Sequence, residues 1–336
     1  MKVSKYPNRN IIINQKEFLY FGGTDYLGVQ QDEAFITIIH HNLKKWGTSY
    51  GSSRDANIKL SIYDEFETYF ASFLNFESSL SISSGTLAGF LVKEYYSIKK
   101  FKSFHIDKSH PAVIFKNSQS VFLGNNLHPD LLSDETEEII ICSDAILALQ
   151  TEPTNFDFLD NINPNKKITL IIDESHSLGV LGKNGQGISA IINHPIIKRK
   201  IFISSLSKAY GVAGGIIASD REFINKLKAL SLFSGAAGAN PAILQTILDA
   251  TDLFQLQLNK LKENLTYFYT RLNGKTQLNY SPNYPVIYYP AVLKKKFFDN
   301  DIVTTNFNYQ DNNINRIIIK ASHHKEDLDK LLKLIP

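Results

Sequence analysis

The sequence predicts an α/β fold in which a large domain holds a mostly parallel sheet and a smaller domain mixes helices and strands. Short apolar runs recur between residues 79 and 219, and helical stretches separate several of them. After Asp220 the chain is largely helical up to about Leu272, and a mixed segment follows. Strands that alternate with helices form parallel sheets, because each crossover returns the chain to the same edge.

Six buried or half-buried strands are expected in the large domain. They are Ser79–Ser83, Ser103–Asp107, Glu138–Ser143, Ile168–Asp173, Ile201–Ser205 and Gly215–Ser219. Open α/β sheets bind ligands beyond the carboxyl ends of their strands. Polar residues that directly follow these strands are therefore the candidates for function.

Shorter elements are expected towards the two ends of the chain. They are strands at 11–13 and 18–21, a helix from about Asp32 to Trp46 that stops at Gly47, a helix near Leu60–Leu74, a strand at Ile314–Lys320 and a helix that opens at Lys325. We expect residues 1–46 to pack with the small domain, residues 47–235 to form the large domain and residues 236–336 to form the small one.

Composition limits the classes of function. The 36 lysines and arginines nearly balance the 33 aspartates and glutamates, which argues against a nucleic-acid-binding protein. The single cysteine, Cys142, lies in an apolar run and cannot form an intramolecular disulfide, which favours a reducing compartment. No signal peptide and no apolar run of about 18 residues is found, so we expect a cytoplasmic protein without a membrane span.

Two histidine pairs, His40-His41 and His323-His324, suggest a metal site only at first sight. Neighbouring residues on a helix or strand point in different directions, so neither pair can act as two ligands of one ion. We expect no metal.

The segment from Ile168 to Gly187 contains the clearest chemical signal. An apolar strand runs directly into Asp173, and His176 follows three residues later. A carboxylate at the end of a buried strand is either a structural cap of a turn or a functional charge, and the segment alone leaves both readings open.

A second signal lies between Ile201 and Gly215, where a strand leads into a serine-rich turn, Lys208 and a glycine-rich stretch. A lone lysine after a strand is usually solvated. Here Ser204, Ser205 and Ser207 could bind an anion, while the glycines let the backbone approach a ligand. A lysine in such a pocket loses its proton more easily, which suits Schiff-base chemistry.

The third signal is a strand that passes through Ser83 and Ser84 into a helix opened by Gly85 and Thr86. Free backbone N–H groups and the positive end of the helix dipole then face a bound anion, as in many phosphate sites. Junctions of this kind are frequent, so the segment is weak evidence alone.

In order and spacing, these three segments resemble fold-type I pyridoxal-phosphate (PLP) enzymes, and specifically the α-oxoamine synthase family. That family includes 8-amino-7-oxononanoate synthase, glycine C-acetyltransferase and serine palmitoyltransferase. The resemblance covers most of the chain and implies the aminotransferase-like PLP fold. It rests on FGGTDYLG at 21–28, GTSYGSSR at 47–54, DESHSLGVLGKNGQG at 173–187, SSLSKAYGVAGG at 204–215 and the strand from Arg316 to His323.

The resemblance implies a role for eight residues, with pyridoxal 5'-phosphate as the cofactor. Lys208 would carry the cofactor as a Schiff base and act as the acid/base at the substrate Cα. Asp173 would pair with the pyridine nitrogen and His176 with the phenolic oxygen. The other five would bind phosphate, ring or substrate: Gly85, Thr86 and Ser205 the phosphate, His110 the ring face by stacking, and Arg316 the amino-acid carboxylate.

Simpler readings remain for two of these residues, and several positions depart from the family pattern. His110 precedes Pro111 and could only cap a turn, while Arg316 could lie on the surface. The departures are Thr24 in place of an asparagine, Ser52 in place of a glycine, Tyr63 in place of a histidine and Ala148 in place of a serine. The cofactor-binding motifs are therefore kept more closely than the substrate-binding ones.

The resemblance implies a PLP-dependent acyltransferase that condenses an amino acid with an acyl thioester and releases carbon dioxide. The acyl donor would be an acyl-CoA or an acyl-carrier protein, and the enzyme would be a homodimer. Two alternatives stay open: an aminotransferase that uses the same lysine and aspartate, and a PLP-binding paralogue without turnover.

Overall fold

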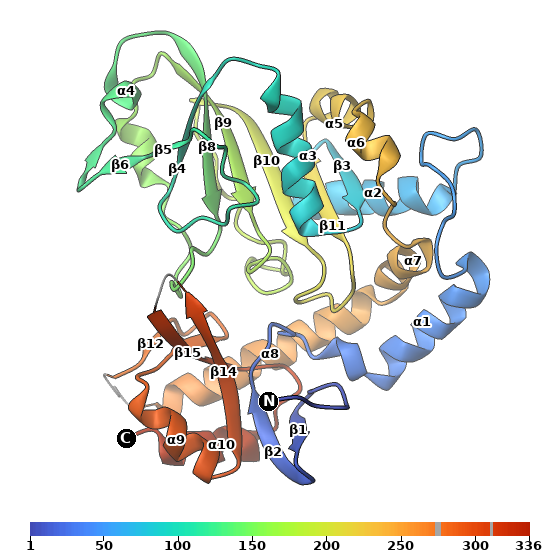
Figure 1. Ribbon diagram of the computed structural model, residues 1–336, viewed down its shortest axis with the longest axis vertical. Coiled ribbons are helices and arrows are strands. Elements are labelled where there is room, and N and C mark those ends of the chain that lie inside the picture. The colour runs from blue at the N-terminus through green and yellow to red at the C-terminus, as the bar shows by residue number, and fades with distance from the viewer. Residues whose placement is uncertain (273–276, 310–311) are drawn as a thin grey trace.

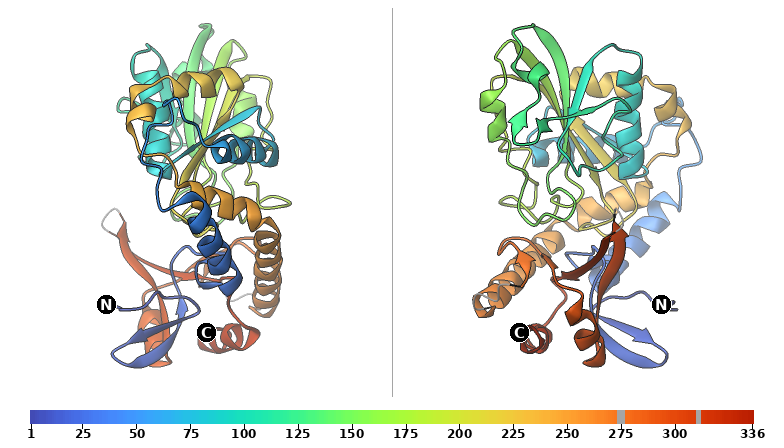
Figure 2. Two further views of the ribbon diagram at one scale, coloured as in Figure 1. Left: turned by 90° about the vertical axis from the view of Figure 1, so that its right-hand side faces the viewer. Right: turned by 60° about the vertical axis from the view of Figure 1, so that its left-hand side comes forward.

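The computed structural model describes residues 1–272, 277–309 and 312–336. Two stacked parts form the molecule, and the long helix α8 (Thr251–Arg271) crosses the region between them (Figure 1). The upper part contains the larger sheet, and both ends of the chain lie in the lower part. The two parts remain distinct in the rotated views of Figure 2.

A seven-stranded sheet forms the centre of the upper part, in the order β3-β11-β10-β9-β8-β4-β5. Every neighbouring pair is parallel except the two that involve β11. The strands are β3 (Ser78–Ile82), β4 (Lys102–His105), β5 (Gln119–Ser120), β8 (Glu137–Asp144), β9 (Lys166–Asp173), β10 (Ile197–Ser205) and β11 (Gly215–Ser219). The predicted mostly parallel sheet is confirmed, and each of the six expected strands is present.

Helices cover both faces of this sheet, and strand β10 shows why its sequence is apolar throughout. Ile201 and Ile203 face the cluster that includes residues of α3 and α5, whereas Phe202 faces the cluster that includes α2. Successive side chains of a strand point to opposite faces, so a strand covered on both sides needs an unbroken apolar run. The free thiol of Cys142 is fully buried in β8, as expected.

The lower part is built on a six-stranded sheet in the order β1-β2-β14-β15-β13-β12. Its strands are β1 (Asn10–Ile13), β2 (Lys16–Phe21), β12 (Asn279–Tyr280), β13 (Val286–Tyr288), β14 (Ile302–Tyr309) and β15 (Asn312–Ile318). Because β2 runs parallel to β14, the first strands of the chain belong to the sheet formed by its last third. The division at residues 46 and 235 stays a prediction.

The remaining α-helices have 4 to 14 residues. They are α1 (Glu33–Trp46), α2 (Ser61–Leu74), α3 (Gly85–Ser97), α4 (Pro129–Leu132), α5 (Arg221–Lys228), α6 (Ser231–Gly235), α7 (Pro241–Asp249), α9 (Val292–Asp299) and α10 (Lys325–Leu334). A small hairpin of β6 (Phe122–Leu123) and β7 (Asn126–Leu127) lies apart from both sheets. In the described part of the chain, no helix combines the length and the apolar character that a membrane span requires.

One connection lacks a helix, and one strand boundary differs from the expectation. The connection from β9 to β10, residues 174–196, contains turns and no helix. Within this connection, the fully buried carboxylate of Glu174 accepts hydrogen bonds from the backbone N–H groups of Ile188 and Ser189. The last strand also ends at Ile318, two residues earlier than expected.

Candidate active site

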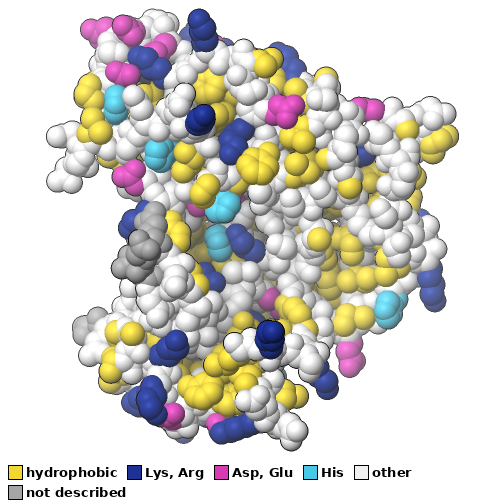
Figure 3. Space-filling view, viewed as in Figure 1, with side chains coloured by type: hydrophobic (Ala, Val, Ile, Leu, Met, Phe, Trp, Pro, Cys, Tyr) yellow, Lys and Arg dark blue, Asp and Glu magenta, His cyan; other side chains and the backbone are white. Residues whose placement is uncertain are grey.

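A cavity of about 490 Å³ opens where the strand ends of the larger sheet face the smaller sheet. The space-filling view shows a hollow between the two parts, with histidine and basic side chains inside it (Figure 3). All eight residues predicted from the sequence line this one cavity: Gly85, Thr86, His110, Asp173, His176, Ser205, Lys208 and Arg316. The fold therefore gathers residues that lie far apart along the chain.

The ends of β9 and β10 supply the centre of the site and are joined by hydrogen bonds. The backbone N–H of Ser175 donates to Asp173 Oδ1 (2.8 Å), which holds the carboxylate at the strand end. The hydroxyl of Ser175 accepts from the backbone N–H of Ser205 (2.8 Å) and ties the two strand ends together. Ser205 in turn shares a hydrogen bond with the hydroxyl of Ser207 (2.8 Å).

Lys208 follows β10 by three residues. Burial lowers the pKa of its amine, while the carboxylates of Asp173 and Asp144 oppose this shift. A lysine that deprotonates more easily is a better nucleophile for a carbonyl carbon.

The surrounding turn holds one correction to the sequence interpretation. Ser204 is fully buried and does not line the cavity, and neither do Gly211 and Gly214. Gly215 instead allows close chain packing, since a Cβ there would lie 2.3 Å from the carbonyl oxygen of Ser84.

The start of α3 forms one end of the cavity. Ser84 caps this helix, and its hydroxyl accepts from the backbone N–H of Leu87 (3.2 Å). The first N–H groups, those of Gly85 and Thr86, have no partner within the helix and are available for an anion. A side chain at position 85 would lie 2.8 Å from the backbone nitrogen of Ser205, so only glycine brings the helix start so close to β10.

His176 lines the cavity close to two positively charged side chains. Burial, together with the positive charges of Lys208 and Arg316, lowers its pKa well below the usual range. Its Nδ1 lies 2.9 Å from the hydroxyl of Tyr26, and its backbone carbonyl accepts from the hydroxyl of Tyr284 (3.2 Å). The lowered pKa favours a neutral imidazole, whose ring contacts Tyr26 while the backbone of His176 is bonded to Tyr284.

His110 lies at the edge of the cavity, and its backbone N–H donates to Asp144 Oδ1 (2.9 Å). Its ring Nδ1 accepts from the backbone N–H of Ala112 (3.2 Å), so this histidine does cap a turn as well as line the cavity. Burial and the neighbouring Asp173 carboxylate raise the pKa of Asp144 well above its usual range.

Asp144 was missed from the sequence. It ends β8 as Asp173 ends β9, and the two are paired in register, so its place after an apolar strand was an available signal.

Arg316 reaches the cavity from β15, across from the strand ends of the larger sheet. Its guanidinium lies over the ring of Phe307, 5.2 Å from the centroid. Its Nε is buried and has no hydrogen-bond partner among the described residues. Arg316 is thus a cavity residue whose Nε donor is unused, and the alternative of a surface residue is wrong.

The departures from the family pattern divide into two groups. Ala148 lines the cavity, beside Leu147 and Leu149. Thr24, Ser52 and Tyr63 are absent from the lining of this chain's cavity, and the hydroxyl of Tyr63 instead donates to the carbonyl of Ala239 (2.9 Å).

Comparison with known proteins identifies the family. Residues 154–335 match the family model described as aminotransferase class I and II. The chain belongs to the class I and II aminotransferase family. It is a transferase that uses pyridoxal 5'-phosphate, as the sequence motifs predicted.

The similar proteins also confirm the predicted resemblance to α-oxoamine synthases. The chain is 25% identical to the 8-amino-7-oxononanoate synthase of Thermosipho melanesiensis, over 96% of this chain and 88% of the relative. It is 26% identical to the serine palmitoyltransferase of Sphingobacterium spiritivorum, over 75% of this chain and 65% of the relative.

Solved structures show the same fold. A serine palmitoyltransferase from S. paucimobilis covers the whole chain with a TM-score of 0.82 at 17% identity, and 90% of that structure is matched. The 8-amino-7-oxononanoate synthase from Francisella tularensis covers 95% of this chain and 96% of its own, with a TM-score of 0.72 at 23% identity. The predicted aminotransferase-like fold is therefore confirmed.

The residues of the cavity fit this cofactor. The start of α3 offers unpaired N–H groups to a phosphate, and the absence of a side chain at Gly85 lets this helix start pack against Ser205. Lys208 offers a buried amine, and Asp173 a carboxylate held by a backbone N–H. Arg316 leaves a buried donor free for a second anionic group.

Proposed function

We propose that this protein is an acyltransferase that condenses an amino acid with an acyl thioester, releasing carbon dioxide and a free thiol. The carbon–carbon bond forms between the amino-acid Cα and the acyl carbon, the Cα–carboxylate bond breaks, and the thiol leaves. The observation that carries the proposal is the unpaired, buried Nε of Arg316 in the same cavity as Lys208 and Asp173. A guanidinium with a free Nε–H donor suits a substrate carboxylate.

Several residues of the chain would have separate roles in this reaction. PLP, when bound, supplies an electron sink for negative charge that develops at the substrate Cα. Lys208 would bind the cofactor through Nζ and then move the proton at Cα. Asp173 would keep the ring nitrogen protonated, and the N–H groups of Gly85 and Thr86 would hold the phosphate with the hydroxyl of Ser205. Arg316 would orient the amino-acid carboxylate.

His110 and His176 would complete the binding of the ring. His110 would stack on it, and the neutral imidazole of His176 would donate a hydrogen bond to its phenolic oxygen. A neutral histidine is suited to donating a hydrogen bond without adding a proton to the ring. The low pKa that burial imposes on His176 keeps it in this form.

The identity of the acyl donor is tested by the thiol it releases. Full-length protein with PLP would be mixed with single amino acids and with short or long acyl-CoA and acyl-carrier-protein donors, and free thiol and carbon dioxide would be measured. Release of both in equal amounts, dependent on the amino acid, is the expected result. Amino-group transfer to a 2-oxo acid without thiol release would identify an aminotransferase, and silence with every donor would contradict the acyltransferase proposal.

A further inference from the structure

The ring of His176 has one edge in the core and one edge at the cavity. Its Nδ1 lies 2.9 Å from the hydroxyl of Tyr26. Tyr26 is fully buried and is not part of the lining of the cavity in the described chain, whereas His176 is. The other ring nitrogen, Nε2, is therefore the one left for a bound molecule.

A neutral imidazole carries a single proton on one of its two nitrogens. The position of this proton decides whether the ring offers a hydrogen-bond donor or an acceptor to a molecule in the cavity. With the proton on Nδ1, the ring would donate to Tyr26 and present an acceptor to the cavity. With the proton on Nε2, Tyr26 would donate to Nδ1 and the ring would present a donor. Only the second arrangement can stabilise an anionic oxygen.

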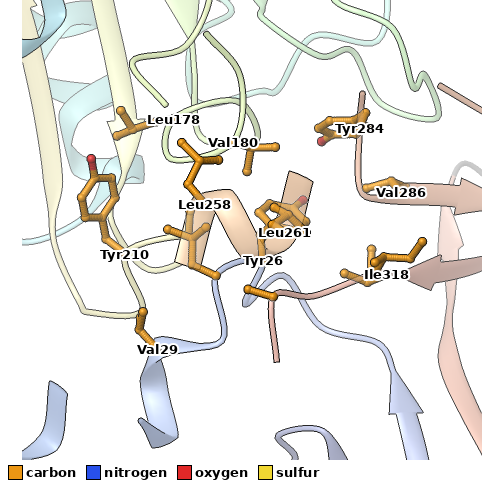
Figure 4. Packing of buried hydrophobic residues seen from close by; sticks show 14 of the residues in the cluster. Tyr26, Val29, Leu178, Val180, Tyr210, Leu258, Leu261, Tyr284, Val286 and Ile318 are labelled. Carbon is orange, nitrogen blue, oxygen red and sulfur yellow. The ribbon is translucent and has the colours of Figure 1, made fainter. Parts of the chain in front are cut away.

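The two tyrosines beside His176 favour the second arrangement. Tyr26 and Tyr284 enter the same buried cluster from distant parts of the chain (Figure 4), and burial raises the pKa of both phenols, so each keeps its proton. Tyr284 donates that proton to the carbonyl of His176. The hydroxyl of Tyr26 can donate either to Nδ1 of His176 or to the phenol oxygen of Tyr284. The imidazole nitrogen is the better acceptor because it is the more basic atom.

We propose that Tyr26 is a positioning residue: its hydroxyl donates to Nδ1 of His176 and keeps the proton of the ring on Nε2, facing the cavity. The inference deepens the proposed function, and it rests on that function for the identity of the oxygen that Nε2–H meets. The hydrogen bond itself belongs to the folded chain. A tyrosine at position 26 thus sets whether the site offers a donor or an acceptor.

The direct test is the position of the proton on His176. Full-length protein with PLP, labelled with ¹⁵N-histidine, would be studied by ¹⁵N NMR, and the signals of His176 would be assigned by their loss in His176→Gln. We expect Nδ1 to resonate as an unprotonated nitrogen and Nε2 as a protonated one. Tyr26→Phe should move Nδ1 towards the protonated position, whereas Tyr284→Phe should leave Nδ1 unprotonated.

A protonated Nδ1 in the wild-type protein, or an unchanged spectrum in Tyr26→Phe, would overturn the proposal. The spectrum requires no turnover, so this result is independent of whether any acyl donor releases thiol. A failed search for the acyl donor would therefore not be mistaken for a failure of the positioning role.

Kinetics provides the second readout. Tyr26→Phe should lower kcat roughly 10- to 100-fold, the size of effect seen when a hydrogen-bond partner that orients a metal-ligating histidine is removed. Tyr289→Phe is the matched control, because its buried hydroxyl bonds to Thr304 away from the cavity (2.6 Å). Equal losses in both variants, or wild-type kcat in Tyr26→Phe, would assign Tyr26 a merely structural role.

Discussion

Buried polar groups near the strand ends of the larger sheet are paired, whereas several near the smaller sheet are not. Asp173 accepts from a backbone N–H, and the carboxylate of Glu174 accepts from two backbone N–H groups. On the other side, Arg316 Nε and both carboxylate oxygens of Asp25 lack a hydrogen-bond partner within the described residues. The larger sheet thus presents a rigid site, while the smaller one holds charges that a ligand or a proton must satisfy.

The difference has a physical consequence. A buried polar group that is fully bonded fixes the local structure, but one without a partner costs free energy until something binds it. We therefore expect substitutions at the strand ends of the larger sheet to weaken cofactor binding, catalysis or folding. Near the smaller sheet, we expect one substitution to change only substrate affinity and another to stabilise the protein.

The largest expected effect is that of Lys208→Ala. Removal of the amine should abolish covalent attachment of PLP and lower the rate roughly 10⁴-fold or more, since one group serves as nucleophile and as acid/base. Mass spectrometry after borohydride reduction would measure the attachment. Lys108→Gln, at another lysine that lines the cavity, should keep the label on Lys208. A label that persists in Lys208→Ala would show that the wrong lysine has been assigned.

Asp173→Asn should lower kcat by roughly 10²- to 10³-fold, or about 3 to 4 kcal/mol of transition-state stabilisation. Asparagine keeps an acceptor for the N–H of Ser175 but loses the negative charge beside the ring nitrogen. The melting temperature and PLP affinity would be measured alongside the rate. Near wild-type activity in a folded variant would exclude this role.

Glu174→Gln should destabilise the protein by about 3 kcal/mol, because the amide NH₂ group would replace an oxygen that accepts hydrogen bonds from buried donors and would leave those donors unpaired. Urea unfolding of the protein without cofactor would measure this. Glu152→Gln, at an exposed position, is the control and should change little. A loss no larger than that of the control would mean that the 174–196 connection does not depend on this carboxylate.

Asp25→Asn should increase the free energy of unfolding, in contrast to Glu174→Gln. Burial raises the pKa of the Asp25 carboxyl to about 6, against the opposing positive charge of Lys320 and the nearby N–H groups of Gly28 and Val29. A raised acid pKa means that stability is full below about pH 4 and is lost as the pH rises through about 6. The shift of about 2 units corresponds to roughly 3 kcal/mol at pH 8.

The asparagine variant should therefore match the wild type at pH 4 and be about 2 to 3 kcal/mol more stable at pH 8. Unfolding free energies at the two pH values would measure the difference, and Glu65→Gln, at an exposed position, would serve as the control. A destabilised variant at pH 8 would show that the Asp25 charge is satisfied by its surroundings.

The smallest expected effect is that of Arg316→Lys. Lysine keeps the charge but loses the planar fork, so KM for the amino acid should rise roughly tenfold with a smaller change in KM for the acyl thioester. Steady-state kinetics with each substrate varied in turn would measure both, and Arg271→Lys, on the exposed end of α8, is the control. A larger rise for the thioester would move Arg316 to the donor side of the cavity.

Much of the site could be predicted because its motifs are local. Asp173 ends a strand, Lys208 and Gly85 each follow one by three residues, and strand ends of a parallel sheet meet at one edge. Asp144 also ends a strand, but it is not among the predicted site residues, because no histidine or lysine lies within a few residues of it. Ser204 was included wrongly, since alternation along β10 turns it away from the cavity.

The sequence by itself determined the order of strands and helices, the cofactor motifs and the family, because each depends on residues close together along the chain. Tertiary packing alone decided which distant groups meet. It placed the hydroxyl of Tyr26 on His176, brought Arg316 into the cavity and left Asp25 without a hydrogen-bond partner among the described residues. These contacts depend on how two sheets and the first strands of the chain pack together, which no local pattern encodes.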